Sequence, residues 1–96
     1  MRAGEEVLVI VVRGRVQGVG FRAFTERVAR QLGVPGWVRN LPSGEVQVVA
    51  RVHGGNRLRL LANLRQGPPG SRVDAVSSAV AGPEVQCPTQ GFTVRF

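Results

Sequence analysis

Near the N-terminus the apolar residues change from a continuous run to a helical spacing. This change constrains the fold of the chain most. Six consecutive apolar residues, Val7 to Val12, predict a strand that is buried on both faces or nearly so. The next run, residues 14–22, reads Gly-Arg-Val-Gln-Gly-Val-Gly-Phe-Arg and predicts a glycine-rich turn that opens a helix. Apolar residues recur along that helix at intervals of three and four, at Phe21, Phe24, Val28 and Leu32. Gly33 and Pro35 are typical of its end.

The remaining chain predicts one hairpin, a second helix and two more strands. Residues 36–40 and 46–52 read as strands joined by a turn at 41–44. Asn56 is a candidate N-cap for the second helix, whose expected buried face is Leu58, Leu60, Leu61 and Leu64. Gly67-Pro68-Pro69-Gly70 ends that helix, and a strand is expected over 72–80. After a loop at 81–91, alternating apolar residues predict a short strand over 92–96.

This order of elements indicates an α+β fold. Strand, helix, strand, strand, helix, strand predicts a ferredoxin-like two-layer sandwich (βαββαβ), an antiparallel sheet with two helices on one face. The preference for right-handed crossovers leaves few competing topologies. We expect a single domain over residues 1–96, with the strand at 36–40 flanking the first strand.

Composition excludes several classes of protein. No apolar stretch approaches the ~18 residues of a membrane span, and the polar N-terminus lacks the apolar segment of a signal peptide, so we expect a cytoplasmic protein. One cysteine and one histidine, Cys87 and His53, argue against a disulfide framework and a structural zinc site. The formal charge is +7, and the chain has arginines but no lysine. It is compatible with anionic partners, or with a simple shortage of surface acids.

The glycine-rich turn resembles a seat for a phosphate. Such a turn directs several backbone N–H groups at one point, and a helix N-terminus adds partial positive charge there. Arg22 lies in the first turn of the helix, where a cation is unfavourable unless an anion is bound. Gln17 either fills the turn or fixes it through hydrogen bonds. The candidate phosphate ligands are Arg15, Val16, Gln17, Gly18, Val19, Gly20, Phe21 and Arg22.

The chemistry available at such a seat is restricted. None of the six acidic residues lies in the seat or beside it in sequence, so a strong general base is lacking. A carboxyl phosphate suits this site, because its carboxylate leaving group has a pKa near ~4–5 and departs unprotonated. A side-chain amide could then orient the attacking water, and Asn40 is the candidate. The residues alone favour a simpler role, in which Asn40 does no more than start the turn at 41–44.

These segments resemble the acylphosphatase family. Residues 12–22 resemble its first signature, and residues 36–40 with Gly44 and Val46 resemble its second; residues 65–69 and 92–96 extend the likeness. The resemblance implies a ferredoxin-like fold and hydrolysis of acyl phosphates to a carboxylate and inorganic phosphate, with no metal or cofactor. It implies that Arg22 holds the phosphate and that Asn40 positions the water. It also implies that main-chain N–H groups of residues 15–21 wrap the phosphate.

The chain departs from the family pattern around the second helix. Val52 stands where the second signature usually ends in glycine, and residues 53–57 are normally more acidic. Arg57 and Arg59 occupy positions where acids or small residues are common. These departures concern the start of the second helix and the surface charge more than the proposed site.

A second hypothesis is an anion- or RNA-binding ferredoxin-like module without catalysis. The positive charge of the chain favours this second hypothesis, but the chain has few aromatic residues, so nucleic acid is not the expected partner. Acylphosphatase-like domains also occur inside larger carbamoyl-transfer maturation proteins, whereas the complete last strand favours a stand-alone enzyme. We expect a monomer that acts on a small-molecule acyl phosphate and does not bind membranes.

Overall fold

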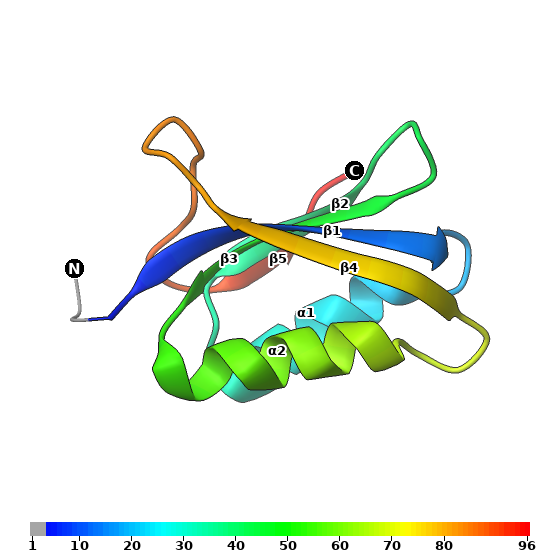
Figure 1. The fold of residues 1–96 in the computed structure, drawn as a ribbon, viewed down its shortest axis with the longest axis horizontal. Coiled ribbons are helices and arrows are strands. Elements are labelled where there is room, and N and C mark those ends of the chain that lie inside the picture. The colour runs from blue at the N-terminus through cyan, green and yellow to red at the C-terminus, as the bar shows by residue number, and fades with distance from the viewer. Residues whose placement is uncertain (1–3) are drawn as a thin grey trace.

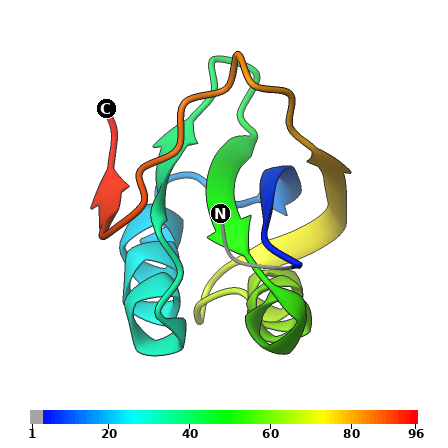
Figure 2. The same cartoon turned by 90° about the vertical axis from the view of Figure 1, so that its left-hand side faces the viewer.

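The computed structural model describes residues 4–96, and these form five strands and two helices in the predicted order. In chain order they are β1 (Glu6–Arg15), α1 (Phe21–Leu32), β2 (Gly36–Asn40), β3 (Val46–Val52), α2 (Gly54–Gln66), β4 (Arg72–Val80) and β5 (Phe92–Val94). The bounds of β2, β3 and β4 are those that the sequence predicts. Both helices lie side by side on one face of the sheet, as expected (Figures 1 and 2).

The strand order is β4-β1-β3-β2-β5, which confirms the ferredoxin-like arrangement of the first four strands. These four pair antiparallel, whereas β5 pairs parallel with β2, so the complete sheet is mixed. The expectation that β2 flanks the first strand is wrong, because β3 folds back from β2 and lies between them. Asn40 pairs with Val46, which pairs with Val12, so Asn40 lies one strand away from the end of β1.

The core lies between the sheet and the helices. The inward side chains of β1 are Leu8, Ile10 and Val12, and the hydrophobic face of α2 packs against the same core. Of the leucines predicted to form that face, Leu60, Leu61 and Leu64 are buried. Leu58 is 72% exposed and its prediction is wrong, because at ~100° per residue it lies about a third of a turn from the centre of the face.

The ends of the helices follow the sequence at α1 and differ from it at α2. Gly33 caps α1 in the left-handed conformation, with a φ of 67°, as predicted. At α2 the N-cap is His53, and Asn56 lies three residues later, inside the first turn. The side chain of Asn56 reaches back and its Oδ1 accepts the His53 N–H at 3.0 Å, in the manner of a capping box. The helix therefore begins before the predicted cap.

Residues 81–91 cross the sheet on the face opposite the helices, from β4 at one edge to β5 at the other (Figure 2). Two side chains fix this loop to the sheet. The indole Nε1 of Trp37 donates to the Gln86 carbonyl at 2.9 Å. The Arg51 guanidinium donates to the carbonyls of Cys87 and Pro88 at 2.7 and 3.1 Å. The outer face is thus partly covered by the chain itself.

β1 continues three residues beyond the predicted strand, and the turn begins at Val16 rather than at Gly14. The register of β1 against β4 shifts between Arg13 and Gly14, which is an irregularity of the β-bulge type. Gly14 has a φ of 130°, and a Cβ there would lie 2.0 Å from the Arg72 carbonyl oxygen. Glycine is therefore required for β4 to approach β1 at the start of the loop.

We predict that Gly14→Ala destabilises the fold by at least about 2 kcal/mol, because the added methyl group must displace the backbone of β4. Urea unfolding followed by circular dichroism measures the change. Gly55→Ala is the matched control: a Cβ at Gly55, in the first turn of α2, meets nothing within 4 Å, so stability should stay equal or rise slightly. Equal unfolding midpoints for Gly14→Ala and the wild type would contradict the prediction.

Candidate active site

The loop between β1 and α1 has a backbone suited to an anion. Gly18 and Gly20 both adopt left-handed conformations, with φ of 75° and 80°, and Gly20 is the N-cap of α1. Alternation of left- and right-handed residues turns successive N–H groups toward one side and forms an anion-binding concavity. Within residues 4–96, no hydrogen bond uses an N–H of residues 17–22 as its donor. These N–H groups are therefore available to a ligand.

Gln17 fixes this loop to the hairpin that follows β2. Its side-chain Nε2 donates to the carbonyl of Leu41 at 2.8 Å and to that of Glu45 at 2.9 Å. Of the two roles that the sequence allowed, loop fixation is the one observed. Hydrogen bonds from Arg13 and Ser43 lower the pKa of the Glu45 carboxyl, whose charge is paired with Arg13 outside the cavity.

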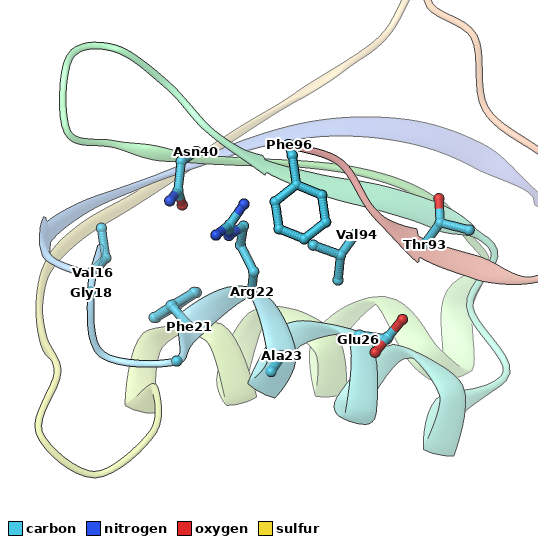
Figure 3. A pocket seen from close by; sticks show the side chains of 11 residues that line it. Val16, Gly18, Phe21, Arg22, Ala23, Glu26, Asn40, Thr93, Val94 and Phe96 are labelled. Atoms are coloured by element: carbon cyan, nitrogen blue, oxygen red, sulfur yellow. The ribbon is translucent and has the colours of Figure 1, made fainter.

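Arg22 rises from the first turn of α1 toward β2 and β5 (Figure 3). Its Nη1 donates to the Arg95 carbonyl at 3.3 Å, and its guanidinium lies 4.6 Å from the centroid of the Phe96 ring. No carboxylate in the described chain forms an ion pair with Arg22. Glu26, one turn along the helix, pairs with Arg30 at 3.2 Å instead. The positive charge of Arg22 therefore remains uncompensated.

Asn40 ends β2 and points toward Arg22 (Figure 3). Its side-chain Oδ1 is buried and accepts no hydrogen bond from any described residue. The turn after it closes without the Asn40 side chain: the Leu41 N–H donates to the Glu45 carbonyl at 2.8 Å and the Gly44 N–H to the Leu41 carbonyl at 3.1 Å. A buried carbonyl without a donor costs about 1–3 kcal/mol, and such groups in folded proteins require an explanation. The hydrogen bonds of the turn do not explain why the Asn40 oxygen is buried without a donor.

These groups line one cavity of about 550 Å³ between the loop, α1, β2 and β5. Its lining residues are Val16, Gly18, Gly20, Phe21, Arg22, Ala23, Glu26, Asn40, Thr93, Val94 and Phe96. Three of the predicted ligands do not line it. Arg15 is exposed at the end of β1, where its backbone lies opposite Arg72 of β4. Gln17 turns to the hairpin, and Val19 packs against the core.

Other candidate chemical groups lie outside this cavity. In residues 4–96, no cluster of three or more His, Cys, Asp or Glu side chains is arranged to hold a metal ion. Cys87 and His53 do not line the cavity. Burial raises the pKa of the Cys87 thiol, which disfavours the reactive thiolate. Neither described helix combines the length and the apolar character needed to cross a membrane.

Comparison with known proteins assigns the chain to a family. The family model for acylphosphatase matches residues 8–94. This chain belongs to the acylphosphatase family. A relative named acylphosphatase from Bradyrhizobium diazoefficiens is 45% identical over 76 residues, which are 79% of this chain and 77% of the relative. The predicted class of enzyme, a hydrolase of the acylphosphatase type, is confirmed.

Solved structures of acylphosphatases have the same fold. That of an acylphosphatase from Coxiella burnetii gives a TM-score of 0.84 at 34% identity, covering 96% of this chain and 94% of that one. The crystal structure of acylphosphatase from Bacillus subtilis gives a TM-score of 0.79 at 30% identity, covering 94% and 98%. The ferredoxin-like fold inferred from the order of elements is thus shared along nearly the whole chain.

One wall of the cavity in this acylphosphatase lies opposite the loop, and the sequence analysis did not predict it. Thr93, Val94 and Phe96 come from β5 and the residue pair after it, and Ala23 and Glu26 come from the first turns of α1. Glu26 could have been found, because the fourth position after Arg22 lies on the same side of the helix, whereas Ala23, the next residue, lies about 100° round the helix. The residues of β5 could not, because alternation predicts a strand but not the strand it pairs with.

We predict that Gln17→Ala loosens the loop, because two hydrogen bonds to backbone carbonyls are lost. The expected loss of stability is about 1–2 kcal/mol, with lower backbone order parameters for residues 18–20 measured by NMR relaxation. Gln31→Ala, at an exposed position of α1, is the control and should change neither. Unchanged order parameters in the Gln17 variant would show that the loop holds its shape without this side chain.

Proposed function

We propose that this acylphosphatase hydrolyses acyl phosphates to a carboxylate and inorganic phosphate at the cavity between the loop and β5. One observation supports this most strongly. The unpaired Oδ1 of Asn40, the uncompensated guanidinium of Arg22 and a loop with unused N–H groups border the same space. A tetrahedral oxyanion and a water molecule would together satisfy all three.

The phosphoryl group binds the loop in this proposal. Main-chain N–H groups of residues 17–21 donate to its oxygens, the N-terminus of α1 adds partial positive charge, and Arg22 supplies a guanidinium. The first turn of α1 contains no acid that would oppose this. Since phosphoryl transfer requires mainly positioning and stabilisation of charge, these donors supply most of what the reaction needs.

Asn40 orients the nucleophile. Its Oδ1 accepts a hydrogen bond from a water molecule and holds the water oxygen in line with the phosphorus–oxygen bond to the acyl group. The water oxygen bonds to phosphorus, the bond to the carboxylate oxygen breaks with its electron pair, and the water proton passes to the phosphate. No side-chain base is needed, because the carboxylate leaves without a proton. We propose that the reaction requires no metal ion.

The RNA-binding alternative is not favoured, because Phe96 alone among the five aromatic rings is fully exposed for stacking on bases, and Phe24 packs partly against the core. Phe21, Trp37 and Phe92 are all buried, at 1%, 6% and 1% exposure. The predictions of a monomer and of a cytoplasmic location stay predictions. Light scattering after gel filtration measures the first.

Arg22→Ala should lower kcat/KM for benzoyl phosphate at least ~10³-fold, because the charged donor to the phosphoryl group is lost. The fold should persist, since the guanidinium makes one hydrogen bond to residues 4–96, with the Arg95 carbonyl. Spectrophotometric assays and circular dichroism measure both. Arg27→Ala removes the same charge from an exposed position of the same helix and should retain activity. Activity of Arg22→Ala within threefold of the wild type would refute the assignment.

Asn40→Ala should lower the activity of the enzyme without lowering its stability. We expect kcat to fall ~10²-fold or more, with KM little changed, while stability stays equal or rises because a buried carbonyl without a donor is removed. Steady-state kinetics and urea unfolding measure the two effects, and a chelator should not alter wild-type activity. A loss of activity that only parallels a loss of stability would indicate a structural role for Asn40.

A further inference from the structure

A second hollow, of about 310 Å³, lies on the face of the sheet opposite the helices. It shares no lining residue with the cavity of the proposed active site. Side chains of a strand alternate between the two faces, so Arg39 belongs to this hollow while its neighbour Asn40 belongs to the other. The residues that line it are Val9, Trp37, Arg39, Gln47, Val49, Glu84, Val85, Gln86 and Arg95.

Two arginines of this hollow are held in place by the same indole. The guanidinium carbons of Arg39 and Arg95 lie 5.3 and 4.1 Å from the centroid of the Trp37 ring. Trp37 is itself fixed, because it is buried and donates to Gln86. The Nε of Arg39 also donates to Gln47 at 2.7 Å. Stacking occupies the face of a guanidinium and leaves N–H groups at its edge, so both are oriented before any ligand binds.

Neither arginine is neutralised within the described chain. Arg13, Arg51 and Arg72 each form an ion pair with a carboxylate, whereas no ion pair involves Arg39 or Arg95. Glu84 lines the same hollow without pairing with either of them. Two guanidinium groups and one carboxylate leave an excess of positive charge at a concave and partly apolar surface.

We propose that this hollow binds a small organic phosphate monoester. The phosphate lies between Arg39 and Arg95, since a dianion matches two guanidinium groups whereas a single carboxylate needs only one. The organic group lies against Val9, Val49 and Val85. The volume falls at the lower end of the range for small-molecule sites, about 300–1,000 Å³, which limits the ligand to one ring or a short chain. This site is independent of the proposed reaction.

The test uses Trp37, the one tryptophan of the sequence, as a reporter. Phenyl phosphate is titrated into Arg22→Ala protein, in which binding at the other cavity is weakened, and the indole N–H is followed by NMR. Saturable shifts are expected. Adding Arg39→Gln or Arg95→Gln should each weaken binding ~10-fold or more, and adding Glu84→Gln should tighten it. Arg65→Gln, which removes an exposed and unpaired arginine on α2, should change nothing.

Four outcomes would overturn the proposal. The first is an indole signal that does not saturate, and the second is equal affinity in the Arg39, Arg95 and Arg65 variants, which would indicate attraction by net charge alone. Equal affinity for benzoate would show that the dianion is not selected. If inorganic phosphate bound as tightly as phenyl phosphate, the contact of the organic group with Val9, Val49 and Val85 would contribute nothing to binding. Circular dichroism of each variant verifies that the comparison is made between folded proteins.

Discussion

The amide of Gln17 joins the two segments on which the cavity is built. The glycine loop needs left-handed residues to turn its N–H groups together, and such a loop has little rigidity of its own. Two hydrogen bonds from Gln17 fix it to the hairpin turn that follows Asn40. The distance between the N–H groups and the Asn40 amide is therefore fixed by this side chain together with the pairing of β1, β3 and β2 and the burial of Val16 and Phe21.

The glycine spacing and the apolar periodicity allowed the loop, α1 and Arg22 as a candidate ligand to be predicted from sequence, whereas the role proposed for Asn40 came from the resemblance to the acylphosphatase family. These features are local, because φ angles and helical faces depend on neighbouring residues. The position of β2 in the sheet and the pairing of β5 are not local. They depend on which strands meet after the chain has folded, and alternating valines favour any such pairing equally. The apolar wall of the cavity was missed for that reason.

Stability and activity are in opposition at this cavity. A carbonyl without a donor at Asn40 and a cation at the positive end of α1 are both unfavourable in the unliganded protein. The surrounding sheet is well packed, with Val12, Val46 and Val48 fully buried, and tolerates this cost. Local conflicts of this kind gather where a ligand resolves them.

The three-residue length of β5 has a consequence for the breadth of substrates. This strand lies at an edge of the sheet and forms the side of the cavity away from the glycine loop. Local opening in proteins concentrates where few backbone pairs hold a segment, and β5 keeps its place mainly through the buried Phe92 and its pairing with β2. In the proposed reaction the phosphoryl group meets the glycine loop, which leaves the side of β5 for the acyl chain, so the wall with the fewest strand pairs would face the part of the substrate that varies.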